Sequence, residues 1–81
     1  MRTRHAIGHV LRKRRQELRL TLREVNQHIS YAYLSEVERG KKDISADLLD
    51  VLTKSLEFSR AEFMIQVAKV LEEGANEPAR F

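Results

Sequence analysis

The sequence predicts an all-α fold, a compact bundle of five short helices. Apolar residues recur at spacings of three and four in successive segments, which is the period of a helix with one buried face. Strict alternation of apolar and polar residues, which marks a half-buried strand, is rare, and the chain holds a single proline. The length of 81 residues fits one small domain with a limited core.

The first helix is predicted over residues 6–18, after a flexible basic arm at residues 1–5. The residues of its apolar stripe are Ile7, Val10, Leu11 and Leu18. Arg14 and Arg15 stand where that stripe would continue. An arginine on an inward stripe either extends its charged end to solvent or is paired.

The second helix begins at a capping box. Thr21 is the N-cap, and Glu24, at the third helical position, reaches back to the backbone of the cap. Leu20 and Val25 flank the box and are placed to form a hydrophobic staple. This helix must be short, because Ser30 already caps the next one.

The third helix, over residues 30–39, has about three turns. Ser30 caps it, and Gly40 ends it, because a residue without Cβ takes the left-handed conformation at little cost. Leu34 and Val37 lie three apart and face inward. The other flank mixes small, hydrogen-bonding and aromatic side chains, as in a helix that presents a surface to a polar partner. Its residues are Tyr31, Ala32, Ser35 and Glu36.

Two further helices complete the bundle. The fourth runs from Asp47 to about Leu56 behind the cap Ser45. Its inward residues are Leu48, Leu49, Val51, Leu52 and Leu56. The fifth, over residues 59–73, opens with a second capping box and a Phe58–Phe63 staple. Gly74 is expected to close it, leaving residues 74–81 as a tail.

The charge of the chain is unevenly distributed. The net charge is +3, yet residues 1–23 carry eight Arg or Lys side chains against one Glu, which gives +7, and the remainder carries −4. One end of the molecule therefore attracts polyanions. Solubility alone is a second explanation, and an anionic membrane surface is a third. The third is disfavoured, because the first helix has no Trp or Phe to insert into lipid.

The sequence also argues against several classes of function. It has no cysteine, which suits a reducing cytoplasm and rules out thiolate metal sites. His5 and His9 lie one helical turn apart and could bind a metal from one face of the helix. His28 is the one other histidine that could serve as a third ligand, so solvated histidines are favoured over a metal site. No apolar run approaches the roughly 20 residues of a membrane span. No nucleophile–base pattern or glycine-rich phosphate loop occurs, so we expect no enzyme, cofactor or small-molecule ligand.

The second and third predicted helices are joined by a very short turn, and the third has a polar face. This is the pattern of a helix-turn-helix. The residues that make this pattern specific are Ile7, Gly8, Leu11, Arg12, Arg15, 20–25 and 33–40. Over residues 6 to 72 they resemble the Cro/C1-type (XRE) family of bacterial DNA-binding regulators. Residues 33–42 are most similar to actinobacterial activators of Clp-protease genes. The resemblance implies a lambda-repressor-like fold and a cytoplasmic, nucleoid-associated transcriptional regulator.

The resemblance also implies a role for individual residues. The third helix would enter the major groove of double-stranded DNA while the second crosses the phosphate backbone. The implied base contacts are Tyr31, Ala32, Ser35 and Glu36. The expected phosphate contacts are Thr21, Arg23, Arg12, Arg39, Lys41 and Lys42. Arg15 and Glu38 match a structural ion pair of the family, which would explain why an arginine interrupts the apolar stripe. Tyr33 is expected to pack half-buried.

One departure from the family pattern lies between Val25 and Ser30, where the family usually has two more residues, including a glycine. Either the second helix ends early in a tighter turn, or the sequence skips residues at this point.

The fifth helix carries more apolar surface than a small bundle needs. Its main stripe is Phe63, Met64, Val67, Val70 and Leu71, and Ile65 with Ala68 adds a second flank. We expect a homodimer through this helix on a pseudo-palindromic operator. The alternative is a helix wholly buried in its own core. The alternative function is the DNA-binding antitoxin of a toxin–antitoxin pair.

Overall fold

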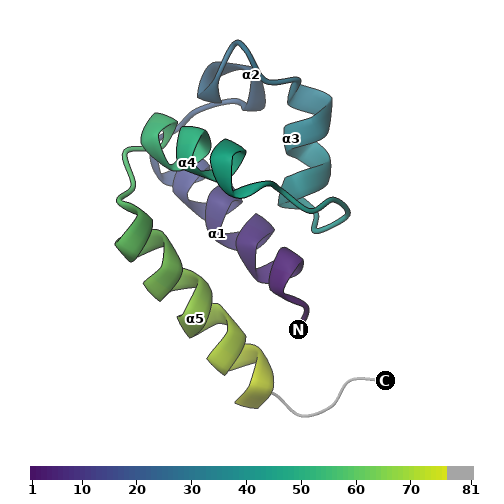
Figure 1. Ribbon diagram of the computed structural model, residues 1–81, viewed down its shortest axis with the longest axis vertical. Helices are drawn as coiled ribbons and strands as arrows, with labels where there is room; N and C mark the ends of the chain where they lie inside the picture. The colour runs from purple at the N-terminus through teal and green to yellow at the C-terminus, as the bar shows by residue number, and fades with distance from the viewer. Residues whose placement is uncertain (77–81) are drawn as a thin grey trace.

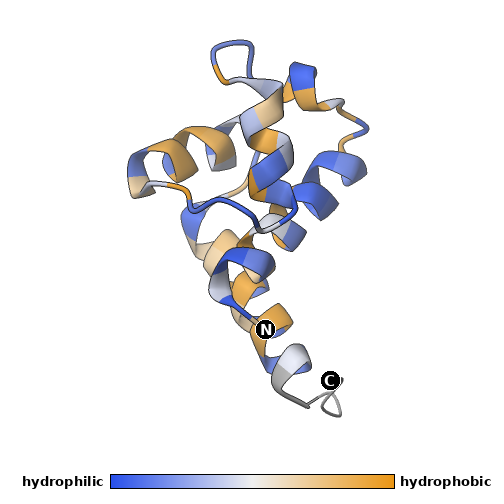
Figure 2. Ribbon diagram, turned by 90° about the vertical axis from the view of Figure 1, so that its right-hand side faces the viewer, coloured by the Kyte–Doolittle hydropathy of each residue, from blue (hydrophilic) through white to orange (hydrophobic). Residues whose placement is uncertain are grey.

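The computed structural model describes residues 1–76, and this part of the chain is all-helical, as predicted (Figure 1). The helices are α1 (Thr3–Glu17), α2 (Leu22–Val25), α3 (Tyr31–Glu38), α4 (Ala46–Ser55) and α5 (Arg60–Asn76). In Figure 2 hydrophobic and hydrophilic residues alternate along the helices, as expected where each helix buries one face.

Helix α1 lies at the centre of the arrangement. It packs against α3 on one side and against α5 on the other, while α2 packs on α3 and α4 on α5 (Figure 1). The long helix α5 therefore lies on the side of α1 away from the helix-turn-helix. The buried core comprises Ala6, Val10, Leu11, Val25, Leu34, Val37, Leu49, Leu52, Leu56, Phe63 and Val67.

The predicted helix caps are present. Thr21 Oγ1 accepts a hydrogen bond from the Glu24 N–H at 3.3 Å, and Glu24 Oε1 accepts from the Thr21 N–H at 2.8 Å, which completes the capping box. Ser30 Oγ accepts from the Tyr33 N–H at 3.4 Å. Gly40 follows α3 with φ of 72°, in the left-handed region that favours glycine.

The fifth helix opens with half of its predicted capping box. Ser59 Oγ accepts from the Glu62 N–H at 3.0 Å. The predicted staple is formed, because the Phe58 and Phe63 rings meet edge to face with centroids 6.2 Å apart. The cap and the staple together fix the angle at which the chain enters α5.

The short connection between α2 and α3 is a tight turn. Helix α2 ends at Val25, and Asn26 is extended. The Asn26 side-chain oxygen accepts from the His28 N–H at 2.8 Å, and its backbone oxygen accepts from the Ile29 N–H at 3.2 Å. Asn26 Nδ2 also lies 3.3 Å from Ser55 Oγ at the end of α4. One asparagine thus shapes the turn and anchors it to the bundle.

The basic arm predicted at residues 1–5 is wrong for residues 3–5, because α1 begins at Thr3. The reason is tertiary contact that local sequence does not show. The imidazole of His5 lies against Gly40, where a Cβ atom would overlap the ring. Arg4 Nη1 lies 3.9 Å from Asp43 Oδ2 in the loop after α3. The turn that ends α3 therefore supports the first turn of α1.

The predicted end of α5 at Gly74 is also wrong, because the helix continues to Asn76. Gly74 lies inside the helix, and a Cβ there would come 3.1 Å from Met1 Cβ. This glycine therefore permits a close approach of the N-terminus, which is a different use from ending a helix. Residues 77–81 of the predicted tail lie outside the described residues.

One predicted core residue of α4 is misplaced. Val51 is 43% exposed, whereas Thr53 is buried. The inward face of α4 is set by its contact with the rest of the bundle, and Val51 falls on the opposite side of the helix from that face. The Thr53 hydroxyl donates to the Asp50 carbonyl at 3.1 Å, so its burial leaves no unpaired polar group.

We predict that Gly8→Ala destabilises the fold. A Cβ at Gly8 would lie 2.6 Å from the Glu38 carbonyl oxygen and would also overlap the Val37 carbonyl oxygen. Both atoms are backbone, so α1 and α3 must separate, at a cost of about 1–3 kcal/mol in the free energy of unfolding. Urea denaturation measures this loss.

Gly74→Ala is the matched control. The added Cβ would meet only the side chain of Met1, and alanine forms helices more readily than glycine. Its stability should be unchanged or raised by up to about 1 kcal/mol. Equal stability of Gly8→Ala and the wild type would contradict the close packing of α1 on α3.

Candidate nucleic-acid interface

Helix α3 presents one face to the core and the other to solvent, as predicted. Leu34 and Val37 are buried, while Tyr31 is 48% exposed and Ala32 is also exposed. Ser35 and Glu36, the other two predicted base-contact residues, are half-buried. The four predicted residues therefore lie along one outward flank, with the most exposed side chains at the N-terminal end of the helix.

Arg23 and Tyr31 form a stack that sequence reasoning missed. The Arg23 guanidinium carbon lies 4.4 Å from the centroid of the Tyr31 ring. Both side chains line an open surface hollow of about 440 Å³, formed with residues 26–30 of the turn. A cation–π contact at an exposed site stabilises by about 0.5–1 kcal/mol. The stack joins α2 to the start of α3 on the outer surface.

A second basic cluster follows the other end of α3. Arg39, Lys41 and Lys42 are all exposed. Lys42 Nζ lies 3.5 Å from Glu36 Oε2, an exposed ion pair of small energetic weight. Its local effect is electrostatic, because the ammonium group offsets the negative charge of the carboxylate on this face.

The two remaining predicted phosphate contacts lie on other elements. Thr21 is exposed at the start of α2, where its hydroxyl accepts from the Glu24 N–H. The bonds that Glu24 accepts from Thr21, first from its backbone, lower the pKa of the Glu24 carboxyl. Arg12 is exposed on α1, between Gly8 and Arg15 on the row that faces α3.

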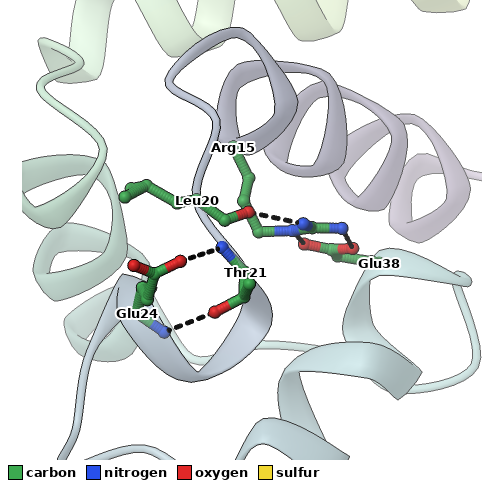
Figure 3. A network of polar contacts seen from close by, with 5 residues as sticks. All are labelled: Arg15, Leu20, Thr21, Glu24 and Glu38. Carbon is green, nitrogen blue, oxygen red and sulfur yellow. Dashed lines mark hydrogen bonds and ion pairs between the residues drawn. The ribbon is translucent and has the colours of Figure 1, made fainter.

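The predicted pair of Arg15 and Glu38 is present and is bidentate (Figure 3). Arg15 Nε donates to Glu38 Oε2 at 2.7 Å, and Nη2 donates to Oε1 at 3.0 Å. Arg15 Nη1 also donates to the Leu20 carbonyl at 2.8 Å. The hydrogen bond to Glu38 raises the pKa of Arg15. The pair thus fixes α3 against both α1 and the connecting segment that leads into α2.

Arg14, the other arginine on the apolar stripe, is also paired. Its Nε donates to the Leu56 carbonyl at 2.9 Å, and its Nη2 donates to the Glu57 carbonyl at 3.1 Å. Its guanidinium lies 5.0 Å from the centroid of the Phe58 ring. Arg14 therefore satisfies the carbonyls at the C-terminal end of α4. The interrupted stripe pointed to both arginines, but the family resemblance implied a partner for Arg15 only.

Tyr33 packs half-buried, as expected, and its hydroxyl donates to the Asp43 carbonyl at 3.0 Å.

Among residues 1–76 no three His, Cys, Asp or Glu side chains are placed to hold a metal ion. No helix in that range is long and apolar enough to cross a membrane.

The predicted dimer stripe of α5 needs correction. Phe63 and Val67 are buried in the chain's own core, so neither is available to a second subunit. They face inward because the 63, 67, 70 row of α5 supplies the surface that covers α1. Met64 and Ile65 remain 51% and 54% exposed, so the alternative of a wholly buried helix is wrong as well.

No protein-family model matches the chain. The transcriptional regulator ClgR of Mycobacterium tuberculosis, in strains CDC 1551 and H37Rv, is 37% identical over 68 residues, which are 82% of this chain and 61% of the relative. The chain spans about three fifths of the length of these curated relatives. The crystal structure of the clp gene regulator ClgR from Corynebacterium glutamicum matches with a TM-score of 0.88 at 36% identity, over 93% of this chain and 82% of that one. The chain belongs to this Cro/C1-type family of clp gene regulators.

Family membership confirms the predicted resemblance, and the relatives are transcriptional regulators rather than enzymes. The restriction-modification controller protein C.Esp1396I also matches, with a TM-score of 0.82 at 21% identity, over 90% of this chain and 97% of that one. At that identity the likeness shows the fold alone. Another structure of that controller is of a tetramer in complex with its natural 35 base-pair operator.

We predict that Glu38→Ala destabilises the protein strongly. The side chains of Arg15 and Glu38 are only 15% and 10% exposed. Removing the carboxylate leaves a largely buried guanidinium without its counter-ion, at a cost of about 3–5 kcal/mol. Thermal or urea unfolding of the purified variant measures the change.

Asp50→Ala is the control, because it breaks the exposed pair with Arg60 and should cost less than about 1 kcal/mol. The double variant Arg15→Met with Glu38→Leu removes both charges and should be more stable than Glu38→Ala alone. A double variant less stable than Glu38→Ala would contradict the assignment of the cost to an unpaired charge.

Proposed function

We propose that the protein is a sequence-specific DNA-binding transcriptional regulator that reads the major groove with α3. The observation that carries the proposal is the arrangement around that helix. Its exposed flank has basic side chains at both ends, Arg23 beside its start and Arg39, Lys41 and Lys42 beyond its end. A polar reading face between two cationic clusters suits a groove bordered by two phosphate backbones.

The base-reading roles follow from the chemistry of the outward side chains. Tyr31 donates to an acceptor on a base edge or packs on a thymine methyl group, and Ala32 contacts such a methyl group. Glu36 accepts from the N4 amino group of cytosine, with Lys42 close enough to offset its charge. Ser35 lies beside Glu36 on the same flank and donates or accepts as the base edge requires.

The phosphate contacts fix the position of α3 in the groove. Arg23 and Thr21 hold one backbone from the side of α2, while Arg39, Lys41 and Lys42 hold the other from the loop after α3. Arg12 extends the charged surface along α1. Such contacts supply affinity and orientation without sequence information. The similarity to clp gene regulators favours regulation over the antitoxin alternative. A DNA partner also implies a cytoplasmic, nucleoid-associated location.

We predict that the double variant Lys41→Ala with Lys42→Ala binds DNA less tightly and with a weaker salt dependence. Each lysine that contacts a phosphate releases counter-ions, so the slope of log affinity against log salt should fall by about one unit per lysine. Fluorescence anisotropy with a labelled duplex over a salt series measures both quantities.

Lys69→Ala removes an exposed lysine from α5, on the far side of α1, and should leave both quantities unchanged. Unchanged affinity and slope in the double variant would refute the assignment of these lysines to phosphate contact.

We also propose that residues 3–76 form one DNA-binding domain that dimerises through α5. Met64, Ala68 and Leu71 lie on one row of the helix, with Met64 and Ala68 exposed and Leu71 half-buried. Ile65 is exposed on the adjoining flank. The same helix of a second copy, related by two-fold symmetry, would cover this surface. Two copies of α3 about 34–36 Å apart would then match half-sites one DNA turn apart.

We predict that Met64→Asp with Ala68→Asp yields a folded monomer. Both residues are exposed in the single chain, so two carboxylates there disrupt the association and spare the core. Light scattering at micromolar concentration measures the mass, and circular dichroism confirms the fold.

Val51→Asp, an apolar-to-acidic change on the exposed face of α4, is the control and should leave the mass unchanged. A wild-type protein that is strictly monomeric at this concentration would refute the dimer.

A further inference from the structure

The structure assigns to Arg23 a second role beyond a phosphate contact. We propose that Arg23 is a positioning residue for Tyr31 and thereby helps to determine which base the protein prefers. This inference rests on the proposed DNA-binding function. It predicts that a side chain outside the reading helix, on α2, changes sequence preference at the position that Tyr31 reads.

The first support is the geometry of the stack. Tyr31 is the first residue of α3 and is half exposed, so the helix by itself leaves its ring several orientations. The guanidinium of Arg23 covers one face of that ring at 4.4 Å. The ring and Arg23 line an open hollow together with residues 26–30 of the turn. The Arg23 contact is thus the constraint that α2 places on the ring.

The second support is the availability of the guanidinium edge. None of the ion pairs among residues 1–76 includes Arg23. A guanidinium that stacks through its flat face keeps its in-plane N–H donors for another partner. One side chain can therefore bind a phosphate oxygen with its edge while its face holds the tyrosine.

The chemistry of this arrangement couples affinity to specificity. A phosphate that binds the Arg23 edge fixes the plane of the guanidinium, and the stacked ring is fixed with it. The Tyr31 hydroxyl is then held in one direction toward the groove, which reduces the ordering cost of its base contact. Arg23→Lys keeps the charge and loses the planar stack.

The short turn explains why the contact joins these two residues. Helix α2 is a single turn, and the connection of residues 26–29 is held by the two hydrogen bonds that Asn26 accepts. Arg23 therefore lies on an element fixed against the start of α3. A rigid support of this kind is what a positioning residue requires.

The test is the base preference of four proteins: the wild type, Arg23→Lys, Tyr31→Ala and the double variant. Each is incubated with a randomised pool of double-stranded DNA, and the bound fraction is sequenced. Tyr31→Ala identifies the base position that Tyr31 reads. At that position Arg23→Lys should weaken discrimination by about two- to fivefold, the size of an exposed cation–π contact. It should keep the salt slope of the wild type, because the charge is retained.

The double variant should discriminate at that position no less than Tyr31→Ala alone, because the two residues act through one contact. Arg39→Lys is the matched control. It makes the same chemical change at a proposed phosphate contact that stacks on no aromatic ring within residues 1–76, and it should alter affinity equally for all sequences. If Arg23→Lys also changes affinity equally for all sequences, Arg23 is a phosphate contact only and the proposal is overturned.

A measurement without DNA separates this inference from the proposed function. The ring current of Tyr31 should shift the Arg23 side-chain protons upfield in the NMR spectrum of the free protein, and Tyr31→Ala should abolish that shift. Absence of the shift overturns the stack whatever the DNA result. A wild-type protein that shows the shift but enriches no sequence from the pool would instead refute sequence-specific DNA binding. Enrichment by the wild type, with no change in preference in Arg23→Lys, overturns the positioning role alone.

Discussion

The position of α3 depends on the bidentate pair between Arg15 and Glu38. Its two hydrogen bonds, at 2.7 and 3.0 Å, allow little rotation of one helix against the other. The same guanidinium holds the Leu20 carbonyl, so one side chain fixes the end of α1, the approach to α2 and the end of α3. Because both side chains are largely buried, any movement of α3 that separated them would expose an unpaired charge to the core.

The two sides of α1 are built differently, and the difference matches their proposed uses. Toward α3 the contact is close and polar, with Gly8 admitting the α3 backbone and Arg15 supplying the ion pair. Toward α5 the contact is centred on the apolar Phe63 and Val67 in the shared core, and charged side chains of both helices line its edge. A close polar contact fixes the angle between α1 and α3, which the proposed reading of DNA by α3 needs. The contact with α5 leaves Met64 and Ile65 exposed on the surface through which we propose that the protein dimerises.

Local signals predicted the helices well, because caps and short-range periodicity act within a few residues. The Thr21 box, the Ser30 cap and the Gly40 stop are of this kind. The errors concern contacts between distant segments. Residues 3–5 are helical because His5 meets Gly40, and Phe63 is buried because α5 covers α1. The Arg23–Tyr31 stack escaped prediction for the same reason, since its geometry depends on the path of the turn between them.

The shortened turn shows how one departure from a family pattern is accommodated. With fewer residues and no glycine between Val25 and Ser30, the chain relies on Asn26, which is extended and bonds both to its own turn and to Ser55 on α4. Asparagine is suited to this task, because its side chain imitates a backbone turn and also donates outward. The anchor to α4 ties the turn to the core rather than leaving it to solvent. A compact turn held in this way keeps α2 close to the start of α3, and the guanidinium of Arg23 accordingly lies over the ring of Tyr31, the first residue of that helix.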